Sequence, residues 1–224
     1  MGNVFFGGGK VGMKTPSLVD AFTVLLLHGD SLKDSGINNV AITNRGVEVS
    51  TTQSKFGGKS LYFNGSSNLT FTLPVDCFAG TQDWTVEWWE YRLGTNTSSA
   101  VFYKPLSSSV CGMILCDDNG QGTLTMYESS NGSSHNVASG LKLGSTLLNQ
   151  WVHRAIVKAS GVYTAYENGV KVNSLTYTGN IPTSSYPMCI GYYGIAMFYG
   201  YINEFRISNT ARWTEAFTPP TESY

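Results

Sequence analysis

The chain has 224 residues, of which 13% are charged and 25 are glycine, and its formal net charge is -1 at pH 7. This charged fraction is about half of the ~25% usual for soluble domains. Without a basic excess to meet a phosphate backbone, nucleic acid is excluded as an expected partner. No stretch approaches the roughly 20 apolar residues of a membrane span, and the apolar run at 23–27 lies too deep in the chain to be the core of a secretion signal.

Residues 1–20 differ from the rest of the chain because they are glycine-rich and basic. The segment 7–15 superficially resembles a phosphate-binding loop, but Pro16 prevents the helix that must follow such a loop. We predict an anchoring arm over 1–20 that binds a partner subunit, with a disordered terminus as the alternative. The side chains expected to make the contact are Val4, Phe5, Phe6, Lys10 and Lys14.

Residues 21–224 form the remaining domain, which consists of short apolar runs separated by Gly, Ser and Asn turns. The first run, 21–28, is almost continuously apolar and predicts a central strand. No stretch has a convincing 3.6-residue period, so the pattern predicts an all-β sandwich or barrel. Further strands are predicted at 40–43, 47–50, 60–63, 68–73, 84–91, 100–103, 112–116, 123–128, 150–158, 162–167, 170–174 and 188–193.

The clearest of these strands is 84–91, because Trp84, Val86 and Trp88 alternate with polar and aromatic side chains. A hairpin is expected at Asn168-Gly169, which is the strongest short turn signal in the chain.

The chain closes with one more strand, in which Phe205 and Ile207 alternate with Glu204 and Arg206. Ile202 is out of phase with this pair, so the strand either begins after it or carries a bulge. We expect Glu204 and Arg206 to lie on a solvated face. The residues after this strand, ending in two prolines, predict a strap laid over the surface at 211–220.

These segments, taken together and in order, resemble the laminin-G-like jelly roll of the concanavalin A-like lectin/glucanase superfamily, in the version common in tailed-phage structural proteins. The resemblance covers roughly residues 22–221. It implies two antiparallel sheets packed as a sandwich, with the first and last strands adjacent. It is carried by LLLHGD (25–30), KDS (33–35), KFGGKSLYFNG (55–65), DWTVEWW (83–89), WVHRA (151–155), YENG (166–169), GYINEFRIS (200–208), ARW (211–213) and FTPP (217–220).

The resemblance also gives functional hypotheses. The first is a non-enzymatic phage virion protein, a head or tail fibre or decoration subunit at the virion surface. Its arm would bind other virion proteins, it would form a homo-oligomer, and its jelly roll would contact host-surface glycans. The second is a carbohydrate-binding lectin module without a virion role, and the third is a glycan hydrolase.

The hydrolase hypothesis lacks its catalytic pair. Glu87 and Glu90 are the nearest candidates, but three positions on a strand place them on opposite faces. We therefore predict no enzymatic activity and no catalytic residue. His28 and His153 are expected to be hydrogen-bonded in the core, and His135 to be solvated.

Metal and sugar sites are each predicted from one pair of residues. No cofactor is predicted, although Asp30 and Asp34 flank the first loop and could hold a structural calcium, the common cofactor of the resembled family. Tyr192 and Tyr193 are the candidate glycan-binding residues, since adjacent strand residues point oppositely and one ring would be exposed. The four cysteines, expected to be reduced and mostly buried, are Cys77, Cys111, Cys116 and Cys189.

Overall fold

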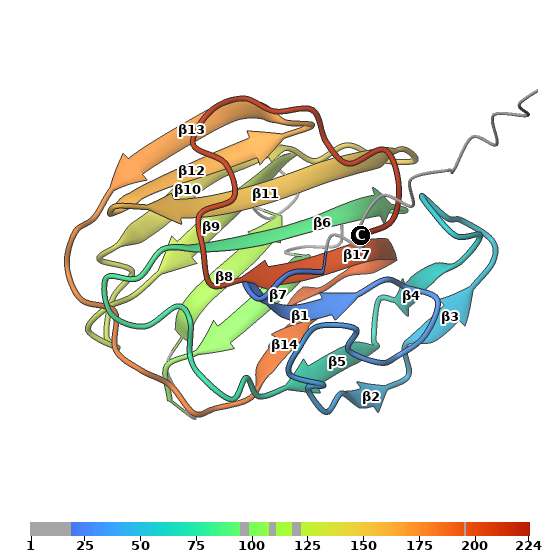
Figure 1. The fold of residues 1–224 in the computed structure, drawn as a ribbon, viewed down its shortest axis with the longest axis horizontal. Coiled ribbons are helices and arrows are strands. Elements are labelled where there is room, and N and C mark those ends of the chain that lie inside the picture. The colour runs from blue at the N-terminus through green and yellow to red at the C-terminus, as the bar shows by residue number, and fades with distance from the viewer. Residues whose placement is uncertain (1–18, 95–98, 108–110, 118–121, 195) are drawn as a thin grey trace, which may run out of the picture.

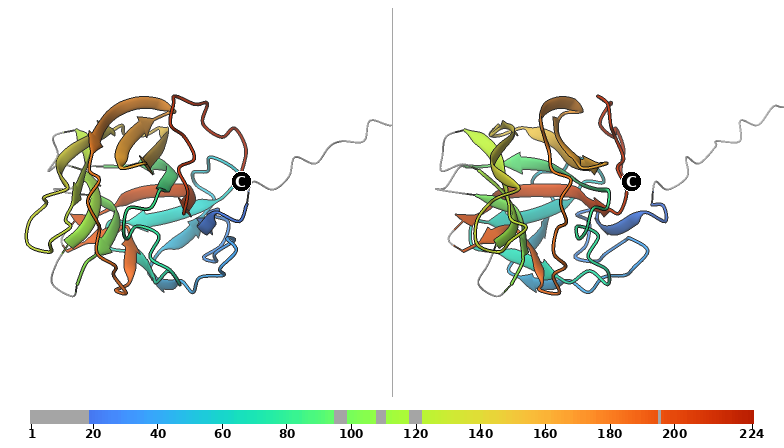
Figure 2. Two further views of the ribbon diagram at one scale, coloured as in Figure 1. Left: turned by 60° about the vertical axis from the view of Figure 1, so that its left-hand side comes forward. Right: turned by 90° about the vertical axis from the view of Figure 1, so that its left-hand side faces the viewer.

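The structure, a computed structural model, describes residues 19–94, 99–107, 111–117, 122–194 and 196–224. These residues form two antiparallel sheets that face each other (Figures 1 and 2). The jelly-roll sandwich of the all-β class is thereby confirmed. The described residues contain no helix that could span a membrane.

The larger sheet has eight strands and carries the outer face to which the C-terminal segment returns. Strand β1 (Thr23–Leu27) pairs only with the closing strand β17, as the adjacency of first and last strands requires. The other strands, in their order across the sheet, are β13 (Val170–Thr176), β12 (Val162–Glu167), β11 (Trp151–Ala159), β6 (Trp84–Arg92), β17 (Tyr199–Ser208), β4 (Ser60–Asn64) and β3 (Glu48–Ser50).

The smaller sheet has seven strands, and a two-stranded hairpin lies beside it. The hairpin consists of β15 (Tyr192–Tyr193) and β16 (Ala196–Met197). The sheet order is β10 (Ala138–Ser145), β9 (Thr123–Glu128), β8 (Cys111–Asp117), β7 (Ala100–Pro105), β14 (Met188–Ile190), β5 (Asn68–Phe71) and β2 (Thr43–Arg45).

The core lies between the sheets and is dominated by aromatic rings. Trp84, Val86 and Trp88 of β6 all face it, which confirms the predicted alternation. Phe205 of β17 stacks on Trp88 with ring centroids 6.2 Å apart and reaches Phe102 of the opposite sheet at 5.9 Å. The closing strand therefore joins the two layers through one ring, which fixes how the sheets face each other.

Strand β17 includes Ile202 and carries a bulge, which is one of the two alternatives that the phase of Ile202 left open. Its pairing with β6 shifts register between Asn203 and Arg206, and Glu204 adopts a positive φ of 52°. The extra residue lets both Ile202 and Phe205 enter the core although they are three positions apart. The bulge lies next to the outer-face charges described below.

The first strand is at an edge rather than at the centre. Strand β1 has one paired neighbour, and the loop after it covers its other edge. The carboxylate of Asp34 accepts hydrogen bonds from the backbone N–H groups of Leu26 (2.9 Å), Gly36 (2.7 Å) and Val40 (2.7 Å). The prediction of a central strand was wrong, because a buried edge covered by a loop gives the same continuous apolar pattern.

The observed strands differ from the predicted strands at two further places, and both contain glycines with a positive φ. Strand β10 was not predicted, because Gly140 (φ 76°) and Gly144 (φ 131°) interrupt its alternation and its register shifts beside each of them. The predicted strand 188–193 is instead split between β14 and β15 at Gly191, whose φ is 88°.

The acidic side chain of Glu128 lies inside the sandwich. Glu128 of β9 is 1% exposed, with Lys104, Lys158 and Tyr163 around it. Burial raises its pKa to about 7, because the charges of the two lysines only partly offset the cost of ionising a carboxyl group away from water. This pKa lies above the ordinary value of 4.5, so the folded protein binds the proton more tightly than the unfolded chain does.

A dependence of stability on pH follows from Glu128. Its contribution is complete below pH 4.5 and is lost as the pH rises through about 7, a difference on the order of 3 kcal/mol. Glu128→Gln does not titrate, so its stability relative to wild type should increase between about pH 4 and about pH 8. Urea unfolding at both pH values measures this change, with Glu48→Gln on exposed β3 as the control. Equal differences at the two pH values would contradict the prediction.

Candidate functional site

The outer face of the eight-stranded sheet carries a chain of buried ion pairs. Glu87 of β6 accepts hydrogen bonds from the Arg206 guanidinium, with the Nε to Oε1 distance 2.6 Å. It also meets His153 Nε2 at 3.3 Å and accepts a short hydrogen bond from the Tyr224 hydroxyl. Burial acts to raise the pKa of Glu87, but the charges of Arg206 and His153 outweigh it and lower that pKa. The side chain of Glu87 therefore stays ionised.

The bulge residue Glu204 forms the second part of this network. Its carboxylate lies 2.8 Å from His28 Nδ1 and accepts a hydrogen bond from the Ser223 hydroxyl at 2.6 Å. The hydrogen bond with Glu204 raises the pKa of His28, although burial acts to lower it. Glu204 is 1% and Arg206 3% exposed, so the expectation of a solvated face was wrong. Alternation alone does not show that the chain's own tail covers this face.

The two predicted core histidines differ in burial. His153 is fully buried with Glu87 as partner, as expected. The side chain of His28, with 21% exposure, lies just after β1 at the margin of the network. His135 is exposed, as expected, and its ring lies 5.1 Å from that of Tyr127.

The strap, residues 211–220, packs on this same sheet face. Trp213 and Phe217 stack on each other with ring centroids 3.9 Å apart, and they lie against Ala155, Val157 and Tyr166 of β11 and β12. The backbone N–H of Phe217 donates to the carbonyl of Gly169 at 3.0 Å, at the turn between β12 and β13. Figure 1 shows this red segment crossing the sheet and bringing the C-terminus back to β17.

The strap and tail leave a hollow of about 410 Å³ over β17, which we call the strap hollow. Half-buried Trp213 and buried Tyr224 provide its aromatic surface, and the guanidinium carbon of Arg206 lies 3.5 Å from the centroid of the Tyr224 ring. Arg212 donates to both carboxylate oxygens of Asp20, at 2.9 and 3.1 Å. The full lining is Asp20, Arg206, Thr210, Arg212, Trp213, Thr218, Pro220 and Tyr224.

The strap hollow combines the two features that a sugar needs. Its aromatic side chains offer an apolar surface for the C–H face of a pyranose or furanose ring, and its hydroxyl and carboxylate oxygens can exchange hydrogen bonds with ring hydroxyls. The volume lies within the ~300–1,000 Å³ usual for small-molecule sites. Sequence reasoning missed this site, because its lining comes from both ends of the chain.

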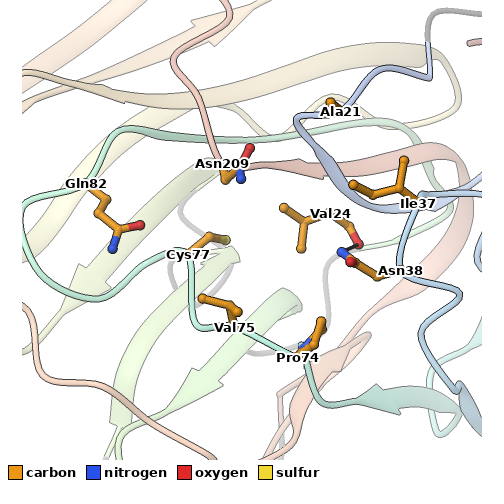
Figure 3. Close-up of a pocket in the computed structure, with 9 residues that line it drawn as sticks. All are labelled: Ala21, Val24, Ile37, Asn38, Pro74, Val75, Cys77, Gln82 and Asn209. Carbon is orange, nitrogen blue, oxygen red and sulfur yellow. Dashed lines mark hydrogen bonds between the residues drawn. The ribbon is translucent and has the colours of Figure 1, made fainter.

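A second hollow, of about 130 Å³, lies at the rim of the sandwich (Figure 3). Its surface is mainly aliphatic, with Val24 and Cys77 at the floor and the exposed side chains of Ile37 and Val75 above them. Three amides, those of Asn38, Gln82 and Asn209, border it. The lining contains no aromatic ring on which a sugar could stack, so its chemistry fits a glycan less well than that of the strap hollow.

The predicted glycan-binding and arm residues are placed only in part. Tyr192 is half-buried in β15, opposite Met197 of β16, and the side chain of Tyr193 lies outside the described part of the structure. The arm residues Val4, Phe5, Phe6, Lys10 and Lys14 also lie outside the described residues. These assignments stay predictions.

The two predicted calcium ligands lie in different surroundings. Asp30 is exposed, whereas the buried Asp34 carboxylate already accepts three backbone hydrogen bonds. Within the described ranges, no group of three or more His, Cys, Asp or Glu side chains could hold a metal ion. Cys77 and Cys189 are buried free thiols, and burial raises the pKa of each to about 12.

Comparison with known protein families shows which superfamily the chain belongs to. Residues 63–216 match the laminin-G family model described as the concanavalin A-like lectin/glucanases superfamily, which is more than half of the chain. The chain belongs to this superfamily. No curated protein sequence matches the chain.

Solved structures with the same fold include carbohydrate-related domains. Domain 4 of AbnA, a GH43 extracellular arabinanase from Geobacillus stearothermophilus, solved with arabinotriose, has a TM-score of 0.65 and 20% identity over 85% of this chain and 93% of that one. The binding domain of botulinum neurotoxin DC in complex with SialylT has a TM-score of 0.65 and 12% identity, over 85% of this chain. This chain covers 48% of that toxin domain. At these identities the likeness shows the fold alone.

Proposed function

We propose that this chain is a non-catalytic carbohydrate-binding module whose ligand lies in the strap hollow. The observation that carries the proposal is the position of Trp213, which is half-buried and lines the hollow together with the polar side chains of Asp20, Thr210 and Thr218. The fold neighbours add support, since one was solved with arabinotriose and another with SialylT.

The two candidate catalytic carboxylates favour a binding role over hydrolysis. Glu87 lies on the outer face, whereas Glu90 binds Trp88 and Arg92 between the sheets, and both are fully buried. A glycosidase needs a general acid with a raised pKa, but arginine partners lower the pKa of both groups. A glycan hydrolase is the alternative, and turnover of an arabinan or glucan by the purified chain would favour it.

A glycan array followed by calorimetric titration tests the binding proposal. We expect saturable binding that Trp213→Ala weakens by roughly tenfold or more, as for the loss of an interface hot spot. Trp213 also packs on the sheet, so weaker binding could come from a displaced strap and not from lost stacking on the sugar. Trp213→Phe, which keeps an aromatic ring, and thermal unfolding of both variants distinguish these two causes. Tyr192→Ala is the matched control. Loss of binding in the Tyr192 variant with full binding by Trp213→Ala would overturn the assignment and place the ligand at β15.

We also propose, as a finer role, that the module is displayed at the surface of a phage virion and anchored by residues 1–20. The support is the phage-like strap sequence and the basic, apolar arm. Deleting 1–18, which leaves Asp20 to pair with Arg212, should give a domain that still binds glycan but fails to join its assembly. Normal incorporation of the truncated chain would rule out anchoring by the arm.

A further inference from the structure

The charged groups around the strap hollow are matched to each other. Arg206 binds Glu87 through two nitrogens, with distances of 2.6 and 2.5 Å. Arg212 directs its guanidinium to Asp20 and also donates to the hydroxyl oxygens of Ser208 at 2.6 Å and Thr23 at 3.0 Å. Each arginine therefore has a nearby carboxylate, and Oε1 of Glu87 also lies 4.0 Å from Arg212 Nε. Most N–H donors of Arg212 already have partners.

In the ion pair between Asp20 and Arg212, the carboxylate is the more exposed group. The side chain of Asp20 is 44% exposed, compared with 13% for Arg212 and 4% for Arg206. The hydrogen bonds from Arg212 hold the pKa of Asp20 at about 2, although burial acts to raise it. The most exposed of these three charges in the lining of the hollow is therefore the negative charge of Asp20, and the two arginine side chains are more buried.

This arrangement has consequences for the ligand. A carboxylate or sulfate on a sugar would approach the Asp20 charge, and Arg212 could bind it through two N–H groups only by giving up an existing partner. A neutral sugar meets no such repulsion. Its hydroxyls can donate to Oδ2 of Asp20, which accepts one hydrogen bond from Arg212, whereas Oδ1 already accepts from Arg212, the Phe22 N–H and the Thr23 hydroxyl. Thr210 and Thr218 add further polar atoms to the lining.

We propose that the strap hollow selects neutral glycans and discriminates against glycans that carry carboxylate or sulfate groups, with Asp20 as the residue that determines this specificity. The inference rests on the proposed glycan-binding function and assigns the class of ligand. Because no net charge has to be neutralised on binding, affinity for neutral sugars should also depend little on ionic strength.

The test titrates the full chain with two neutral trisaccharides, arabinotriose and cellotriose, and with two acidic ones, trigalacturonate and 3′-sialyllactose. We expect at least tenfold tighter binding of a neutral probe, unchanged when the salt concentration is raised from about 50 to about 300 mM. Asp20→Asn removes the nearest countercharge of Arg212 and leaves only the more distant Glu87, so this variant should bind the acidic probes more tightly than wild type does. Asp30→Asn, also exposed, is the control and should change neither class.

The outcomes distinguish the neutral selectivity of the hollow from its glycan-binding function. Tighter binding of the acidic probes by wild type, weakening as salt is added, would overturn the neutral selectivity and leave the glycan-binding function standing. Unchanged discrimination in Asp20→Asn would remove Asp20 as its cause. Absence of binding to all four probes and to the glycan array would overturn the proposed function itself.

Discussion

Glu90→Gln is expected to lower the free energy of unfolding by about 3–5 kcal/mol. Glu90 is fully buried and accepts hydrogen bonds from Arg92, Arg154 and the Trp88 indole N–H, all at about 3 Å. Burial acts to raise its pKa, but the two guanidinium charges hold that pKa at about 2. The nearly isosteric amide keeps the shape and removes the charge, so two buried arginines lose their shared counterion.

Urea unfolding of Glu90→Gln beside Glu48→Gln measures this loss. Glu48 lies on exposed strand β3, where removing a charge should change stability by no more than about 0.5 kcal/mol. A similar small change in both variants would show that the buried ion pairs of Glu90 contribute nothing to the fold. The same pKa direction predicts a pH effect, since the stability from Glu90 is present above its ordinary pKa of 4.5 and is lost as the pH falls toward 2.

Gly169→Ala is expected to detach the strap. Gly169 has a φ of 77° in the β12–β13 turn, and a Cβ atom there would collide with the backbone carbonyl of Phe217. The left-handed conformation alone costs an alanine about 1–2 kcal/mol, and the collision adds about 1–3 kcal/mol if the strap stays in place. Movement of the strap would separate Trp213 from the sheet, so glycan affinity should fall roughly tenfold or more.

Gly58→Ala is the matched control for this substitution. Its φ of 75° is nearly the same, but no atom lies within 4 Å of the position a Cβ would take. It therefore carries the conformational cost without the collision. Equal destabilisation of the two variants, together with unchanged glycan binding, would contradict the role of Gly169 in seating the strap.

The sequence predicts the main layers of this fold because its strongest local patterns agree with the tertiary packing. The alternation around Trp88 identifies a strand with one face in the core, and the Asn168-Gly169 pair identifies the β12–β13 hairpin. The phase of Ile202 indicates an irregularity in β17, which the structure shows to be a bulge. In each case the pattern that supports the prediction lies within a few consecutive residues of the chain.

The parts that could not be predicted depend on contacts between distant segments. Glu204 and Arg206 look like solvated strand residues until Ser223 and Tyr224 fold back over them. The strap hollow joins Asp20 to Arg212 across 192 positions, a pairing that no local pattern encodes. The strap itself was expected on the surface, but its stacking on the sheet and the site beneath it required the structure.

The most direct test of the central claim is a crystal structure of the chain with a glycan identified by the array. The sugar is expected over Trp213 in the strap hollow, with a ring hydroxyl within hydrogen-bond distance of the Asp20 carboxylate. A sugar bound instead at Tyr192, or in the rim hollow beside Val24, would contradict the assignment of the strap hollow as the glycan-binding site.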